Sequence, residues 1–122
     1  MSTLEVSNLN DGTKTVATTN LTNGSAKVWV NFNGTGTIAT RDSFNVASLT
    51  DSNTGDYLVN FTNNMSNSDY VGNVTANPSG YAGAYGGSDS RATGSLGTKI
   101  VDASNTDKDS NYIGASVKGD LA

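Results

Sequence analysis

The sequence predicts an all-β fold: a small antiparallel β-sandwich or jelly-roll-like domain with long polar loops and an extended N-terminal arm. Asn, Thr, Ser and Gly make up half of the 122 residues, and three of these four types favour turns and loops over helix interiors. Several short segments alternate apolar and polar residues, which is the pattern of a strand with one buried face. These segments recur about every ten residues with turn-rich stretches between them, as in sandwiches and barrels.

Residues 1–25 are expected to form the arm, and residues 26–122 a single β domain. The apolar residues of the arm are scattered among polar ones, so we interpret it as a docking or oligomerisation segment. It has no basic region followed by an apolar run, and no part of the chain approaches the roughly 20 apolar residues of a membrane helix. We therefore expect no signal peptide and no membrane insertion.

The first strand of the domain is expected at residues 27–32. Its apolar residues Val28, Val30 and Phe32 alternate with Lys27, Trp29 and Asn31, so the first three should face the core and Trp29 the opposite side. Glycines at positions 34 and 36 then mark a turn.

The next two strands should form a hairpin. The parity of the apolar residues changes between Val46 and Leu49, which predicts a bulge or bend. Residues 51–56 are a dense turn cluster. Alternation resumes after it, with three apolar residues on one face: Tyr57, Val59 and Phe61.

The remaining segments are expected to be short strands joined by polar loops. Met65 anchors one loop, and a strand follows through Tyr70 and either Val71 or Val74. Residues 77–97 hold the single proline and many glycines, which predicts a long loop or a weak hairpin. The final strands are expected at 98–103 and 112–117.

The composition argues against an enzyme. There is no His and no Cys, which excludes the commonest general base, the thiol nucleophile and most transition-metal sites. A glycosidase would need a pair of carboxylates, but nearly all of the eleven Asp and Glu residues lie in turn clusters, where they accept hydrogen bonds from backbone amides. We therefore predict no catalytic residues, no cofactor and no metal site.

One metal alternative stays open. Residues 51–56 and 107–111 have the closely spaced oxygen groups that Ca²⁺ prefers, but both segments fail the spacing of an EF-hand loop. A Ca²⁺ site of another kind at Asp107 and Asp109 remains an alternative.

Four residues are candidates for recognition: Trp29, Tyr81, Tyr85 and Arg91. An exposed aromatic such as Trp29 offers a large contact area at low entropic cost, although an aromatic at this position also suits packing under the arm or inside an oligomer. The other three belong to a glycine-rich segment suited to adaptable contacts. With a net charge of −4 and seven dispersed Lys and Arg residues, we expect no nucleic acid binding.

Residues 26–73 resemble a module of fibre-like and short structural virion proteins of tailed bacteriophages. The resemblance is carried by the segments "AKVWVNFNGTGT", "SFNVASLTD" and "TGDYLVNFT", with Met65 and Tyr70 after them. It implies a non-enzymatic virion component, commonly a homotrimer, with no catalytic residues to transfer. Its place would be the virion surface, after synthesis in the host cytoplasm.

The resulting hypothesis is a trimeric surface component: a short fibre, a knob, or a decoration of the capsid or tail. Val, Ile, Leu and Phe make up about a fifth of the chain, so a core partly shared between subunits is expected. The other partners would be capsid or tail proteins. The alternative is a carbohydrate-binding adhesin module that recognises host surface glycans.

Overall fold

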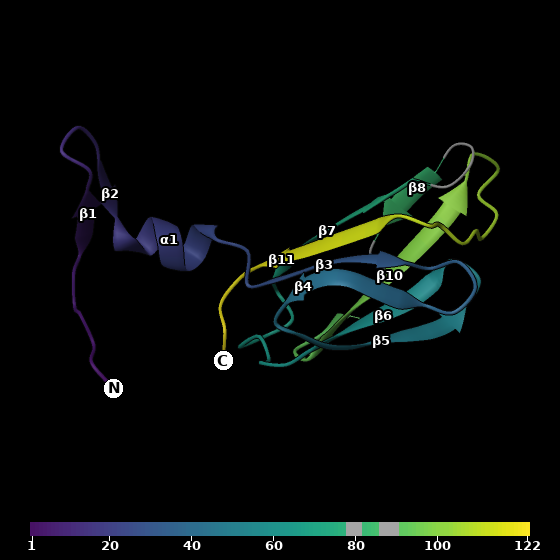
Figure 1. Ribbon diagram of the computed structural model, residues 1–122, viewed down its shortest axis with the longest axis horizontal. Helices are drawn as coiled ribbons and strands as arrows, with labels where there is room; N and C mark the ends of the chain where they lie inside the picture. The colour runs from purple at the N-terminus through teal and green to yellow at the C-terminus, as the bar shows by residue number, and fades with distance from the viewer. Residues whose placement is uncertain (78–81, 86–90) are drawn as a thin grey trace.

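The computed structural model describes residues 1–77, 82–85 and 91–122. Two antiparallel sheets pack face to face as a β-sandwich (Figure 1), which confirms the all-β prediction. In the first sheet the strand order is β4 (Ala39–Phe44), β3 (Val28–Asn33), β11 (Ile113–Lys118) and β7 (Val71–Ala76). The order in the second sheet is β5 (Val46–Asn53), β6 (Asp56–Phe61), β10 (Ser95–Asp102) and β8 (Ala82–Tyr85), and β9 (Arg91–Ala92) also pairs with β10.

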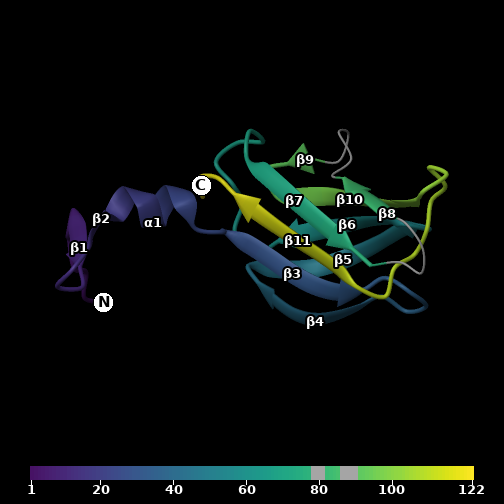
Figure 2. The ribbon, with the colours of Figure 1, turned by 90° about the horizontal axis from the view of Figure 1, so that it is seen from above.

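The arm projects from one end of this sandwich (Figures 1 and 2). It contains a hairpin of β1 (Asn8–Asn10) and β2 (Thr15–Ala17), followed by the seven-residue helix α1 (Thr18–Gly24). Asp11 Oδ1 accepts hydrogen bonds from the backbone amides of Thr13 and Lys14 and so closes the hairpin turn. No residue of the arm is buried. No helix in the described ranges has the length and apolar character needed to cross a membrane.

The core lies between the two sheets and uses one face of each central strand. On β3, Val28, Val30 and Phe32 are at most 3% exposed, as the alternation predicted. The other buried apolar residues come from β6, β10, β11 and the connection after β6: Tyr57, Val59, Phe61, Met65, Tyr70, Leu96, Ile100, Val101, Ile113, Ala115 and Val117. The apolar strand faces are thus covered within one chain.

The bulge predicted between Val46 and Leu49 lies in β5, where the pairing register with β6 shifts between Val46 and Ser48. Just before it, a bend at Asn45 takes the chain from one sheet to the other. Asn45 has a φ of 59°, a left-handed conformation that Asn tolerates better than most residues. Its side-chain amide donates to the backbone oxygens of Lys27 and Asn63, and its Oδ1 accepts from the Asn63 amide at 2.8 Å. The bend leaves Phe44 exposed on the outer face, while Val46 packs against the core.

Of the two alternatives for residues 77–97, the weak hairpin describes the end of the segment and the long loop does not, because Arg91 and Ala92 of β9 pair with Leu96 and Ser95 of β10. Ser95, Leu96 and Gly97 belong to the eight-residue strand β10, and Leu96 is 1% exposed. Leu96, Thr98 and Ile100 form the inward face of this strand, but a small and a polar residue interrupt the apolar signal. Residues 78–81 and 86–90 of the predicted loop lie outside the described part of the chain.

A hydrogen-bond network ties three loops together at the end of the core opposite the arm. The Tyr57 hydroxyl lies 2.9 Å from the backbone oxygen of Gly34 and 2.7 Å from Asp109 Oδ1. The same carboxylate oxygen accepts from the Gly55 amide at 2.8 Å. Burial raises the pKa of the Tyr57 hydroxyl well above its usual value, and the hydrogen bond and charge of Asp109 raise it further.

Gly34 is required by this close approach. A Cβ at position 34 would lie 2.5 Å from the Tyr57 hydroxyl oxygen and 2.9 Å from Ile113 Cδ1. We therefore expect Gly34→Ala to lower the free energy of unfolding by about 1–3 kcal/mol, measured by urea denaturation. Gly24→Ala is the control, because no atom lies within 4 Å of a Cβ there; an equal loss in both variants would contradict the steric argument.

The raised pKa of Tyr57 also predicts a loss of stability at alkaline pH. Below pH 10 the hydroxyl is protonated in both states; above it the unfolded chain releases the proton and the folded chain retains it. The free energy of unfolding should therefore fall as the pH rises above 10, by at most about 1.4 kcal/mol per pH unit from this group. Urea denaturation of the wild type and of Tyr57→Phe between pH 8 and 11 checks this, since the variant should show a shallower fall.

Candidate functional site

The outer face of the first sheet carries polar side chains around a gap over β11. The strand register places Ser116 of β11 between Trp29 of β3 and Asn73 of β7. One step further along, Gly114 lies between Asn31 and Thr75 in the same way. β11 thus contributes a hydrogen atom and a small hydroxymethyl group where its neighbours contribute larger side chains.

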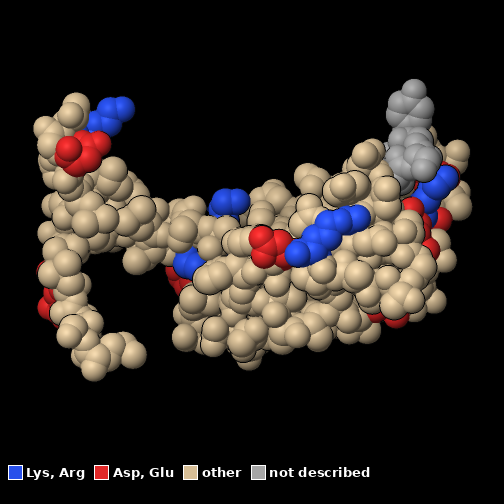
Figure 3. Space-filling model, in the orientation of Figure 1, with Lys and Arg blue, Asp and Glu red and all other residues tan. Residues whose placement is uncertain are grey.

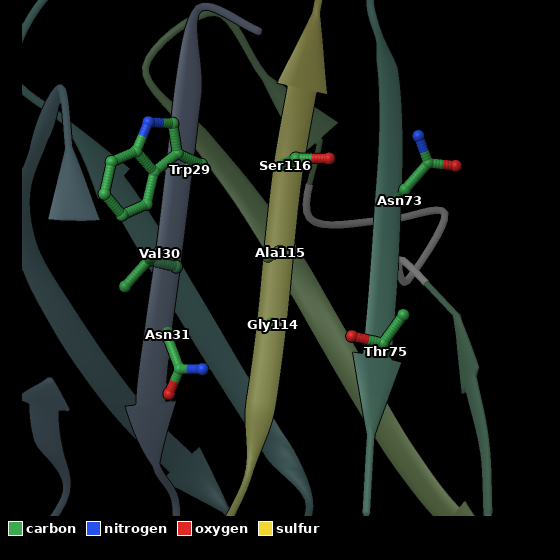
Figure 4. A pocket seen from close by; sticks show the side chains of 8 residues that line it. All are labelled: Trp29, Val30, Asn31, Asn73, Thr75, Gly114, Ala115 and Ser116. Carbon is green, nitrogen blue, oxygen red and sulfur yellow. The ribbon is translucent and has the colours of Figure 1, made fainter. Parts of the chain in front are cut away.

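This difference in size produces an open groove, which we call the outer groove. Its first part is a depression of about 250 Å³ lined by eight residues, shown in Figure 4: Trp29, Val30, Asn31, Asn73, Thr75, Gly114, Ala115 and Ser116. A second depression of about 310 Å³ shares Asn31, Thr75 and Gly114 with it and extends to Asn77 and Tyr112. The outer groove therefore runs along β11 between β3 and β7.

Because Gly114 has no side chain, the space above β11 at this position stays open. A Cβ at this position would lie 2.9 Å from Thr75 Oγ1, so any side chain here would displace Thr75 and occupy the space above β11. Figure 4 shows the Asn31 amide and the Thr75 hydroxyl pointing toward β11 from its two sides. Hydrogen-bonding groups therefore face each other across the glycine.

Trp29 borders the outer groove on the β3 side. Its side chain is 38% exposed, and Figure 4 shows the indole on the side of β3 away from β11, with a broad ring face turned outward. Phe44 of β4 is its partner across the strand pair and is 53% exposed. The indole thus offers a flat apolar surface beside the polar groups of the outer groove.

The side chain of Arg41 lies at the Tyr112 end of the outer groove. The Arg41 guanidinium lies 4.1 Å from the centroid of the Tyr112 ring, which is a favourable cation–π distance, and donates to Asn31 Oδ1 at 3.3 Å. The residues that line the outer groove are themselves uncharged. On the face drawn in Figure 3, acidic and basic side chains are few and dispersed.

The structure does not bring the predicted recognition residues together. Tyr81 lies outside the described residues, and only the backbone of Tyr85 is described, in β8 opposite Lys99. Arg91 lies in β9, exposed, with its guanidinium 5.6 Å from the centroid of the Tyr70 ring. Trp29 belongs to the first sheet, whereas Tyr85 and Arg91 belong to the second, so among the candidates that the structure describes Trp29 alone lies at the outer groove.

The carboxylates considered for Ca²⁺ have other partners. Asp107 Oδ2 lies 2.9 Å from Lys99 Nζ, and Asp109 Oδ1 accepts from Tyr57 and Gly55. Within the described part of the chain, no three His, Cys, Asp or Glu residues gather as a metal site would require. The structure thus offers no support for the calcium alternative at these two residues.

Sequence reasoning missed the groove residues Asn31, Asn73, Thr75, Gly114 and Ser116. Each occupies an outward position of a strand, where a polar or small residue is ordinary. The sequence predicts a strand at residues 112–117, but which strands flank it depends on pairing between residues that are distant in the sequence.

The chain matches no known protein family, no curated protein and no solved structure.

The two faces of β3 should respond differently to substitution. Phe32→Ala should lower the free energy of unfolding by about 3–5 kcal/mol, because the ring is fully buried. Trp29→Ala should cost roughly 1 kcal/mol or less, because the indole lies on the outer face. Urea denaturation of both variants checks this, and a loss at Trp29 as large as that at Phe32 would contradict the assignment of Trp29 to a surface role.

Proposed function

We propose that this protein is a non-enzymatic structural component of a bacteriophage virion. It is a homotrimeric surface component, such as a short fibre, a knob or a decoration of the capsid or tail, and it contributes to particle assembly, stabilisation or host attachment. The resemblance of residues 26–73 to phage virion modules supports the class. The absence of His and Cys from the sequence supports a non-catalytic role.

The observation that carries this proposal is the uneven distribution of exposed apolar residues. The sandwich buries its apolar strand faces within one chain, with core residues at most 8% exposed. The arm does the opposite, and all its large apolar side chains are at least 39% exposed: Met1, Leu4, Val6, Leu9, Val16 and Leu21. Exposed large apolar residues also occur on the sandwich, but there the core is covered within one chain, whereas in the arm no apolar residue is buried. The arm therefore depends most on a partner, and a shared sandwich core is not required.

Three of these side chains gather in one place. Leu9 and Val16 are direct partners across the arm hairpin, and together with Leu21 of α1 they border a depression of about 360 Å³. A hairpin of two three-residue strands and a seven-residue helix have little stability of their own. We propose that the arm is held by contacts with other subunits and with the capsid or tail.

The location of the protein tests the proposal directly. Immunogold labelling of purified phage particles should place it on the particle surface, and native mass spectrometry of the full chain should give three times the protomer mass. The copy number then distinguishes decoration from a fibre, since a decoration is present in far more copies. A protein absent from purified particles would overturn the proposal.

A charge in the arm should prevent docking without unfolding the sandwich. Leu9→Glu places a carboxylate where about 1.5–3 kcal/mol of apolar burial is expected on docking, so incorporation into particles should fall about tenfold or more. Thr19→Glu is the matched control, since Thr19 is an exposed polar residue of α1. Quantitative immunoblotting of purified particles checks this, and normal incorporation of Leu9→Glu would contradict a docking role for the arm.

A second candidate function is that of a carbohydrate-binding adhesin module that recognises host surface glycans. The observation that favours it is the outward indole of Trp29 beside the amide and hydroxyl groups of the outer groove. This function is compatible with the first, since a virion surface component can also attach to the host.

A further inference from the structure

We infer that the outer groove is a binding site for an uncharged oligosaccharide, laid along β11 with one sugar ring at its end reaching across β3 to the indole of Trp29. The inference rests on the second candidate function and specifies the site and the ligand class. It is carried by the juxtaposition of a flat aromatic surface, a floor of small residues and polar groups beside that floor.

The chemistry of the lining matches that of a sugar. A sugar ring has apolar C–H faces, which suit the broad face of an indole, and a rim of hydroxyls, which donate and accept hydrogen bonds. The Asn31 amide and the Thr75 hydroxyl point toward the floor from its two sides, and the Ser116 hydroxyl stands on it; these groups also donate and accept. A mostly preformed site with a few well-placed polar groups is what small-ligand recognition requires.

The lining also indicates the charge of the ligand. None of the residues that line the two depressions carries a charge. The nearest guanidinium to the lining, that of Arg41, lies against Tyr112 and Asn31 at the far end. An acidic sugar would lose hydration without gaining a cation inside the outer groove, so the site favours a neutral one.

The shape of the outer groove favours an oligosaccharide over a single sugar. Its floor extends along β11 from Ser116 to Tyr112, which is about 13 Å at the rise of a strand. The β7 wall carries a polar residue in each of the two rows, and the β3 wall carries Trp29 in one row and Asn31 in the other. Several linked rings can therefore lie in line, each within reach of a wall.

The topology argues against a peptide added as a further strand. β11 lies inside its sheet and pairs with β3 on one side and β7 on the other, so its backbone groups are already hydrogen-bonded. Strand addition needs a free sheet edge. A ligand over β11 must be recognised by side chains, and the side chains present suit a sugar.

The single tryptophan of the chain provides a direct probe, because Trp29 lies at the outer groove. We would titrate the full-length protein with hexamers of glucose (α-1,4 and β-1,4 linked), mannose and N-acetylglucosamine, and with hexagalacturonate as the acidic comparison. At least one neutral hexamer should change the tryptophan fluorescence in a saturable manner, and hexagalacturonate should not. Failure of every neutral hexamer, or a response to the acidic hexamer alone, would overturn the inference.

Variants that retain Trp29 test whether the other residues of the outer groove contact the sugar. Thr75→Ala and Ser116→Ala should each weaken the binding of the responding hexamer about tenfold, as the loss of one hydrogen bond implies. Gly114→Val should abolish it, because the added side chain fills the floor. Thr50→Ala is the matched control, an exposed strand threonine on the second sheet, and its affinity should match the wild type. Unfolding midpoints of all variants confirm that each is folded.

The outcomes separate this inference from the functions on which it depends. If the immobilised protein binds an array of these sugars but Thr75→Ala and Ser116→Ala bind equally well, sugar binding stands and the outer groove is the wrong site. If the array shows no binding, the adhesin function fails as well. Neither result affects the proposal of a virion component, which depends on the location of the protein and on the arm.

Discussion

The contact between Phe32 and Tyr57 joins the two sheets and determines much of the rest of the structure. The two rings meet edge to face, with centroids 5.4 Å apart and both side chains fully buried. Such a contact contributes specific geometry beyond the burial of apolar area. Because the Tyr57 hydroxyl also reaches Gly34 and Asp109, this contact sets the spacing of the sheets and the position of the loops at one end.

This arrangement explains how a chain with few large apolar residues closes a core. The aromatic rings of Phe32, Tyr57, Phe61 and Tyr70 span the space between the sheets in two edge-to-face pairs, so a small number of side chains fills a large volume. Every buried side-chain nitrogen or oxygen among the described residues has a hydrogen-bond partner. The outward side chains of the strands therefore do not contribute to the core and can be the small and polar residues of the outer groove.

The strands with strict alternation were predictable, since the inward residues of β3 and β6 follow from the period of two alone. β10 was not recognised in full because Gly97 and Thr98 interrupt its apolar pattern. The hairpin and helix of the arm could not be predicted either, because their apolar residues contact one another rather than a core and so follow no regular period in the sequence. Trp29 could be assigned to the outer face, whereas the outer groove could not be predicted, since it depends on which strands flank β11 and pairing partners are distant in sequence.

The arm is joined to the end of β3, an interior strand. β3 pairs with β4 on one side and β11 on the other, and the Lys27 amide donates to the backbone oxygen of Val117 where the arm meets the sandwich. A mechanical load applied along the strand through the arm would act on both ladders in shear, so that many hydrogen bonds resist it together instead of opening one by one. Because the arm is attached to a central strand, a pulling force on it would be shared by two strand pairs.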